Sequence, residues 1–243
     1  MKTPVRRFCL PLVDYIAAGI LLLVTLLLTW LVISSPQFML TGTIVTSVQT
    51  NEKVVALTFD DGPLPVHTGE TLEALKKGNV TATFFVIGRE ASAHESELRA
   101  IVAAGHAVGN HGYSHTMMAF LPPSQIAREI EATDAVIRAA GYTGDISFRA
   151  PYNIKFWFLP RYLATNSRPD ISRDVLVAEG TSRTAEAIAA DVVSRVQPGS
   201  IILLHPMYDH TASTREAIPR IVEALTQKSY RFVTIDELLE LGN

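Results

Sequence analysis

The amino-acid sequence predicts an α/β protein in which the strands of a parallel sheet alternate with helices, preceded by one membrane-spanning helix. Three observations support this prediction. After residue 53, seven short apolar runs alternate with stretches of helical period, a pattern typical of parallel βαβ units. The run 54–59 is apolar and β-branched, as expected of a strand buried on both faces. Residues 16–33 form an uncharged apolar run of 18 residues.

The first 33 residues are expected to form a cytoplasmic tip and a transmembrane anchor. The run 16–33 would span about 27 Å as a helix, close to the roughly 30 Å hydrocarbon core of a bilayer. Lys2, Arg6 and Arg7 precede it, so the N-terminus should stay cytoplasmic and the rest should lie in the periplasm or outside the cell. The alternative is a cleaved signal peptide, but the run exceeds the usual length of about 7–15 residues and no A-x-A pattern follows it.

Residues 34–52 are expected to be a short stalk, and residues 53–243 a catalytic domain. The single cysteine, Cys9, precedes the apolar run, so the outer domain should contain no disulfide. Without the three basic and one acidic residues of the first 33, the remainder has 18 basic and 23 acidic residues. An acidic surface is poorly suited to nucleic acid, so no nucleic-acid partner is expected.

The expected strands are short apolar runs, at residues 54–59, 82–87, 106–109, 146–148, 171–177, 200–204 and 231–233. The expected helices have apolar residues at helical spacing, at residues 68–77, 95–104, 124–140, 184–196, 213–226 and 235–241, with 156–164 as a further candidate. Ser124 is a candidate N-cap, and Gly78, Gly105 and Gly141 stand where helix C-terminal glycines belong. Seven strands suit either a small, irregular barrel or an open doubly wound sheet.

Polar residues gather at the carboxyl ends of the expected strands, where the chemistry of α/β barrels is found. Five strands contribute residues to this rim: Asp60 and Asp61, then His111 and His115, then Arg149, Asp174 and His205. A random scatter would place some of these residues at strand starts. We therefore expect one site that combines them, and leave the other histidines as structural or surface residues.

The residue types indicate metal-assisted hydrolysis. Two adjacent carboxylates raise each other's pKa, unless a cation binds one of them and the other stays free to act as a base. His111 and His115 have i, i+4 spacing and would lie on one face of a helical or coiled segment. With Asp61 they form a set of two histidines and one carboxylate, which leaves positions open for water and substrate. The same set also holds iron in oxygenases, but those sites give no reason for Asp60 and His205.

Taken together and in this order, the segments resemble the polysaccharide deacetylases, carbohydrate esterase family four, which include nodulation-factor chitooligosaccharide deacetylases. The resemblance covers about residues 52–240 and rests on four motifs, Thr58-Phe59-Asp60-Asp61-Gly62, His111 to His115, Arg149-Ala150-Pro151-Tyr152 and Leu203-Leu204-His205. It implies a distorted (β/α)7 barrel that removes N- or O-acetyl groups from sugars with a divalent metal, commonly zinc, with Co²⁺, Ni²⁺ or Mn²⁺ as alternatives.

Carried over by motif position, the resemblance assigns a role to each rim residue. Asp61, His111 and His115 would bind the metal. Asp60 would be the base, Arg149 would orient it, and His205 would be the acid, held by Asp174. Tyr152 would offer its backbone N–H to the oxyanion and Leu203 would line the pocket for the acetyl methyl group.

Two positions depart from the family pattern. Gly112 stands where Ser or Thr usually follows the first histidine of the second motif, which removes a hydroxyl but no ligand. The fourth motif usually pairs an Asp with a Trp, and here Asp174 is followed by Val175. The family pattern therefore does not predict how the substrate contacts that side of the pocket.

The function expected from these features is N-deacetylation of an envelope polysaccharide that contains N-acetylglucosamine, such as peptidoglycan or a chitin-like polymer, by an enzyme anchored in the plasma or inner membrane. Within the same chemistry, an O-acetyl-sugar esterase or a deformylase of lipid-linked sugars remains an alternative. A non-catalytic glycan-binding relic is a third, but such a protein has no need for both Asp60 and His205.

Overall fold

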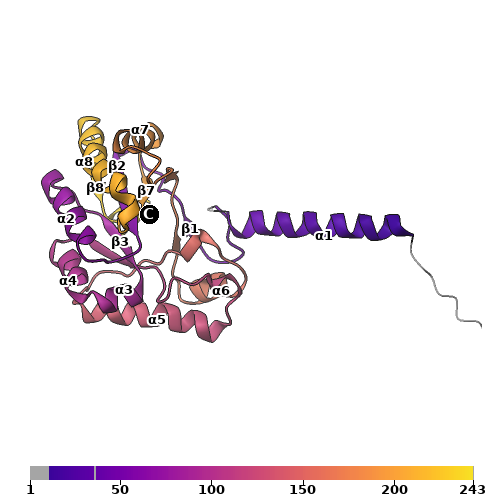
Figure 1. Cartoon of the computed structure of the whole chain (residues 1–243). Coiled ribbons are helices and arrows are strands. Elements are labelled where there is room, and N and C mark those ends of the chain that lie inside the picture. Colours follow the sequence, from indigo (N-terminus) through magenta and orange to yellow (C-terminus); the bar gives the residue numbers. More distant parts are fainter. Residues whose placement is uncertain (1–10, 36, 243) are drawn as a thin grey trace, which may run out of the picture.

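A computed structural model describes residues 11–35 and 37–242 of the chain. Lys2, Arg6 and Arg7, on which the predicted orientation of the N-terminus rests, lie outside the described residues, as does Cys9. Figure 1 shows a compact α/β domain from which one long helix projects.

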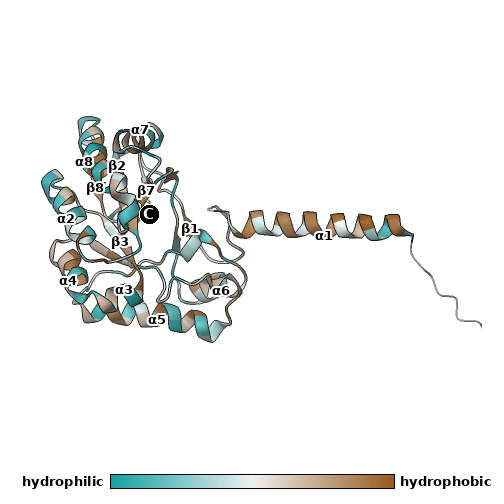
Figure 2. Cartoon of the chain, viewed as in Figure 1, coloured by the Kyte–Doolittle hydropathy of each residue, from teal (hydrophilic) through white to brown (hydrophobic). Residues whose placement is uncertain are grey.

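The projecting helix, α1 (Leu12–Ile33), contains the predicted apolar run and begins at Leu12 rather than at residue 16. It is long and apolar enough to cross a membrane, and Ile33 is its only buried residue. The other side chains of α1 face outward and are mostly apolar, which shows as brown in Figure 2. A core helix of a soluble domain would instead bury one face.

The main sheet has the strand order β4-β3-β2-β7-β6, with β8 also paired to β2, and all of these pairs are parallel. The bounds are β2 (Val54–Asp60), β3 (Thr83–Val86), β4 (Ala107–Asn110), β6 (Val175–Leu176), β7 (Ser200–Leu204) and β8 (Arg231–Val233). This confirms the α/β class and the parallel sheet. Every residue of β2 is buried, as its apolar sequence predicts.

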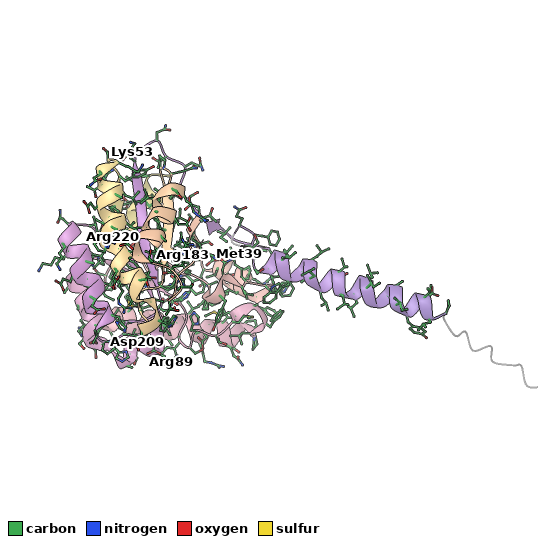
Figure 3. The ribbon with its side chains drawn as sticks, turned by 45° about the horizontal axis from the view of Figure 1, so that its top comes forward. Met39, Lys53, Arg89, Arg183, Asp209 and Arg220 are labelled. Carbon is green, nitrogen blue, oxygen red and sulfur yellow. The ribbon has the colours of Figure 1, made fainter. Side chains whose placement is uncertain are left out.

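The register brings the carboxyl ends of the central strands to one rim. Asp60 pairs with Phe85, Phe59 with Leu204, and Val86 with Asn110. Polar residues that directly follow these strands are therefore neighbours in space, although they are far apart in the sequence. Figure 3 shows the two ends of the domain, with Arg89 and Asp209 near this rim and Lys53, which precedes β2, at the opposite end.

The sheet is irregular beyond β4. The expected strand 146–148 is reduced to Phe148, which makes single parallel bridges to Asn110 and Asp170. The expected strand 171–177 is divided into β5 (Asp170–Ile171) and β6. The reason is that the carbonyls of Ile171 and Ser172 accept hydrogen bonds from the Arg149 side chain. β5 pairs with β1 (Ile44–Val45), a strand within the segment expected to be a stalk.

The helices follow the expected alternation and surround the sheet (Figure 1). Their bounds are α2 (His67–Gly78), α3 (Gly88–Ala93), α4 (Glu95–Ala103), α5 (Pro123–Ala139), α6 (Phe158–Thr165), α7 (Ala185–Arg195), α8 (Ala212–Gln227) and α9 (Ile235–Glu240). The prediction of Ser124 as an N-cap is wrong, because α5 begins at Pro123, which suits the first turn of a helix. Gly105 and Gly141 have φ of 80° and 94°, as expected of residues that end helices.

The loop after Phe148 is fixed by one buried carboxylate. Asp170 accepts a hydrogen bond from the backbone N–H of Ala150 at 2.9 Å, and its other oxygen lies 3.3 Å from the Lys155 ammonium. Asp170 and Lys155 are 1% and 3% exposed, so the pair is shielded from water. Burial lowers the pKa of Lys155, and the charge of Asp170 opposes this effect. Residues 150–155 are thus held at both ends.

We expect Asp170→Ala to lower the free energy of unfolding by about 3–5 kcal/mol, because it leaves the Lys155 charge buried without a partner. Urea denaturation of the full chain in detergent would measure this. Replacing both members, Asp170→Leu with Lys155→Met, should cost clearly less than the single change, and an equal or larger cost would contradict the assigned pairing.

Candidate active site

A pocket of about 300 Å³ opens at the rim and gathers eight of the nine residues singled out in the sequence. Asp174 is the exception. The other lining residues are Ala150, Asn153, Arg173 and Leu176. The convergence expected from the strand ends is therefore present, with the site positioned by β2, β4, β7 and the loop after Phe148.

Three side chains in this pocket could hold a metal ion. One ligand atom each from Asp61, His111 and His115 lie within 4.8 Å of one another. Asp61 Oδ1 is 3.4 Å from His115 Nε2 and 3.9 Å from His111 Nε2. Among the described residues, no hydrogen-bond donor satisfies this buried oxygen. An unpaired buried carboxylate oxygen is costly, so its position between two imidazoles fits a divalent cation.

The two histidines present suitable nitrogen atoms. His111 Nδ1 lies 2.8 Å from the backbone carbonyl of Arg149, which can only accept, so Nδ1 carries the proton and Nε2 keeps its lone pair. Burial and the neighbouring His111 lower the pKa of His115, against the opposing charges of Asp61 and Asp60. The lowered pKa favours the neutral imidazole of His115, the form that binds a metal.

The segment that carries these histidines is an irregular loop rather than a helix. His115 has φ of 57° and Gly112 has φ of 76°. Glu129 of α5 holds the loop, because its carboxylate accepts hydrogen bonds from the backbone N–H groups of Tyr113 and Ser114. A Cβ at Gly112 would lie 2.6 Å from the Met118 side chain. The departure from the family pattern at Gly112 therefore suits this backbone.

Asp60 has a different environment from Asp61. Its Oδ1 accepts a hydrogen bond of 2.6 Å from Arg149 Nη1, and both side chains are buried. Burial alone would raise the pKa of Asp60, but the charges of Arg149, His111 and His205 outweigh it and hold the pKa below its usual value. Asp60 is thus an ionised carboxylate at neutral pH. Its second oxygen lies 3.6 Å from His111 Nε2, at the edge of the metal position.

His205 is paired with a carboxylate, but the partner is Glu179 and not Asp174. His205 Nδ1 lies 2.7 Å from Glu179 Oε2, and Glu179 also accepts the backbone N–H of His205. Burial would lower the pKa of His205, but the hydrogen bond to Glu179 and the charges of Asp60, Glu179 and Asp61 raise it to about 9. The imidazole is therefore protonated at neutral pH.

The prediction that Asp174 holds the acid histidine is wrong in this structure. Asp174 accepts hydrogen bonds from the Ser200 hydroxyl and the Ile201 backbone N–H, at the start of β7. His205 follows the other end of that strand, so Asp174 cannot reach it. The strand expected at 171–177 ends its paired part at Leu176, and the chain continues along the rim to Glu179. The sequence did offer a signal for this partner, because Glu179 is a carboxylate three residues after the end of the strand.

The remaining rim residues lie around the pocket mouth. Tyr152 is 60% exposed, has φ of 57°, and packs edge-on against His115 with ring centroids 4.6 Å apart. Leu203 is 5% exposed and supplies an apolar wall. Arg173 and Asn153 also line the pocket and were not singled out from the sequence, because neither belongs to a recognisable motif.

With this geometry described, comparison with known proteins identifies the family. Residues 47–155 match the polysaccharide deacetylase family. The chain is 33% identical over 190 residues to a chitooligosaccharide deacetylase from Sinorhizobium fredii, covering 72% of this chain and 87% of that protein. It is 32% identical to the peptidoglycan-N-acetylmuramic acid deacetylase PdaC of Bacillus subtilis, over 80% of this chain but only 40% of PdaC. The chain belongs to the polysaccharide deacetylase family, carbohydrate esterase family four.

Solved structures agree. A peptidoglycan N-acetylglucosamine deacetylase superposes with a TM-score of 0.75 at 30% identity, covering 79% of this chain and 91% of that one. An acetyl xylan esterase from Clostridium thermocellum, solved with a cobalt ion, gives 0.67 at 38% identity, covering 78% and 91%. A family pseudoenzyme from Bacillus anthracis gives 0.73 at 28% identity, covering 83% and 70%. The expected α/β fold with a parallel sheet is confirmed, because it matches the structures of these family members.

We expect His115→Ala to weaken binding of Zn²⁺ or Co²⁺ by more than about 100-fold, because even residues that only support a ligand contribute about 10–100-fold. Equilibrium dialysis of the full chain with elemental analysis would measure this. His210→Ala removes an exposed histidine outside the pocket and is the matched control. Equal metal content in the two variants would contradict the ligand set.

We expect Glu179→Gln to lower the pKa of His205, because it removes the carboxylate that raises this pKa. A residue that must be protonated to act loses function as the pH rises through its pKa. The alkaline limb of kcat/KM should therefore move to lower pH. Asp174→Asn should leave that limb in place, and a shift in Asp174→Asn instead would restore the earlier assignment.

Proposed function

We propose that this protein is an active, metal-dependent N-deacetylase of envelope glycans that contain N-acetylglucosamine, such as peptidoglycan or a chitin-like polymer. The observation that carries the proposal is one pocket with an ionised carboxylate, a protonated imidazole and a three-residue metal set. The printed names of the relatives include deacetylases of both glycans. Because the chain covers only 40% of PdaC, that protein's substrate is a guide to the class alone.

Asp61, His111 and His115 fit a divalent ion, for which we propose Zn²⁺, with Co²⁺, Ni²⁺ or Mn²⁺ as alternatives. Such an ion supplies Lewis acidity, which polarises the acetyl carbonyl and can lower the pKa of water to about 7. Ionised Asp60 accepts the proton of the attacking water, and Arg149 keeps this carboxylate in place. Protonated His205 donates to the sugar nitrogen, since an amine leaves poorly unless it is protonated.

The rest of the pocket positions the acyl group. We assign the Tyr152 backbone N–H to the developing oxyanion, a role in which one donor typically contributes about 10²–10³ in rate. Leu203 provides an apolar wall for the acetyl methyl group. Asp174 is not part of this mechanism, and Glu179 takes the orienting role first expected of it.

The pseudoenzyme in the family makes a non-catalytic role the main rival. Asp60, His205 and their partners Arg149 and Glu179 argue against it, because a glycan-binding protein does not need a paired base and a paired acid. An O-acetyl esterase or a deformylase of lipid-linked sugars would use the same groups, but it would cleave an ester or a formamide in place of the acetamide.

We also propose that α1 anchors the catalytic domain at the outer face of the plasma or inner membrane. The support is the end of the helix: Ile33 is buried with Ala119 and Ile154, and the Ile33 carbonyl accepts the Lys155 backbone N–H at 3.1 Å. A cleaved signal peptide would remove part of this packing. Intact mass analysis of the protein from membranes should find α1 present, and a mature N-terminus after Ser34 would contradict the anchor.

We expect Asp60→Asn to bind metal as the unmodified protein does and to lose about 10²–10⁴ in turnover, because it removes the base but no ligand of the metal set. The measurement is acetate release from acetylated chitooligosaccharides and peptidoglycan fragments by the metal-loaded full chain. No acetate from any substrate would favour the pseudoenzyme, and equal release by Asp60→Asn would show that another group is the base.

A further inference from the structure

Exposed aromatic side chains surround the point where α1 enters the domain. Trp30, Phe38, Phe120, Trp157 and Phe158 are 40–67% exposed, and we call these five residues the aromatic collar. The chain has two tryptophans, and both belong to it. Large exposed aromatics in one region of a protein surface usually mark an interaction site.

The collar is organised by the buried cluster of Ile33, Ala119 and Ile154. Each member comes from a different segment: α1, the turn that ends in Phe120, and the loop before α6. Trp30 lies one helical turn before Ile33, and Phe120 directly follows Ala119. Phe156, which packs on the cluster, lies 5.8 Å from the Phe120 ring by centroids and directly precedes Trp157. The aromatics of all three segments thus lie around the base of α1.

We infer that the aromatic collar sits in the interface of the lipid bilayer that α1 crosses, and so holds the catalytic pocket at the membrane surface; this rests on the anchor proposed above. The 22 residues of α1 span about 33 Å, enough for a hydrocarbon core of roughly 30 Å. This places Trp30, in the last turn of α1, at the outer interface. Tryptophan is enriched there, because its ring is apolar and its N–H can reach water.

The collar is also continuous with the catalytic pocket. Asn153 lines the pocket and donates a hydrogen bond of 3.0 Å to the Ser34 carbonyl, directly after α1. Tyr152 is adjacent to it. Figure 3 shows α1 leaving from the flank of the domain, near Met39, between the end that carries Lys53 and the end that carries Arg89 and Asp209. The pocket therefore faces sideways, beside the bilayer, and would act on acetyl groups that reach the membrane surface.

A sugar-stacking platform is the other use of exposed aromatics near such a pocket. The collar favours lipid because it includes Trp30, which belongs to the membrane helix itself, and Phe38, which follows that helix. A platform for soluble glycan would have no reason to extend onto α1.

Single-tryptophan variants of the full chain test the inference in lipid nanodiscs that contain lipids with brominated acyl chains, which quench nearby indoles. Trp30→Phe leaves Trp157 as the only tryptophan, and Trp157→Phe leaves Trp30. We expect strong loss of fluorescence in both. The triple change Trp30→Phe, Trp157→Phe and Tyr230→Trp is the control. Tyr230 lies beneath Lys53, at the end of the domain opposite the rim, and a tryptophan there should keep its fluorescence.

The possible outcomes distinguish this inference from the proposal that α1 anchors the protein in the membrane. Quenching of Trp30 with no more quenching of Trp157 than of the Tyr230→Trp control would overturn the collar and keep the anchor. Absence of quenching for Trp30 would overturn both. A response of Trp157 to soluble chitooligosaccharide but not to brominated lipid would identify a sugar platform and also overturn the inference. Acetate release by the same variants reports on the proposed deacetylation independently.

Discussion

The buried guanidinium of Arg149 is the group on which the rest of the site depends. Its donors bind Thr58 and Asp60 on β2, and the carbonyls of Ile171 and Ser172 on the irregular side of the sheet. Its Cζ atom lies 4.0 Å from the centre of the Phe85 ring. These contacts use four of its five N–H donors. Arg149 therefore joins the two halves of the rim, and its charge helps to keep Asp60 ionised. Among the residues that the structure describes, no guanidinium pairs with the adjacent Asp61, which supports the proposal that Asp61 binds a cation.

The helix α1 and the pocket are connected through the loop 150–155. Asp170 holds this loop at Ala150 and Lys155, and the end of α1 holds it at Asn153 and Lys155. A change at the base of the helix therefore reaches the pocket wall over a few residues, without crossing the core. This arrangement explains why a segment so close to the pocket is irregular and yet well fixed.

The sequence predicted the parts of the molecule that local pattern controls. Alternating apolar and helical segments predicted the α/β class, and acids and histidines at strand ends predicted the composition of the pocket. The errors lie where tertiary contacts override pattern. Residues 171–177 form two pieces because Arg149 takes their carbonyls. Glu179 replaces Asp174 because the chain turns along the rim after β6, and periodicity carries no information about that path. The residues of the aromatic collar are scattered in the sequence and are united only by packing at Ile33.

We propose that Asp61, His111 and His115 together bind one divalent ion beside Asp60. Anomalous diffraction at the zinc absorption edge, from crystals of the full chain grown with zinc, tests it most directly. We expect one strong peak about 2.0–2.2 Å from an Asp61 carboxylate oxygen and from Nε2 of both histidines. A dominant peak elsewhere, or a peak bound by only one of the three residues at full zinc occupancy, would contradict it.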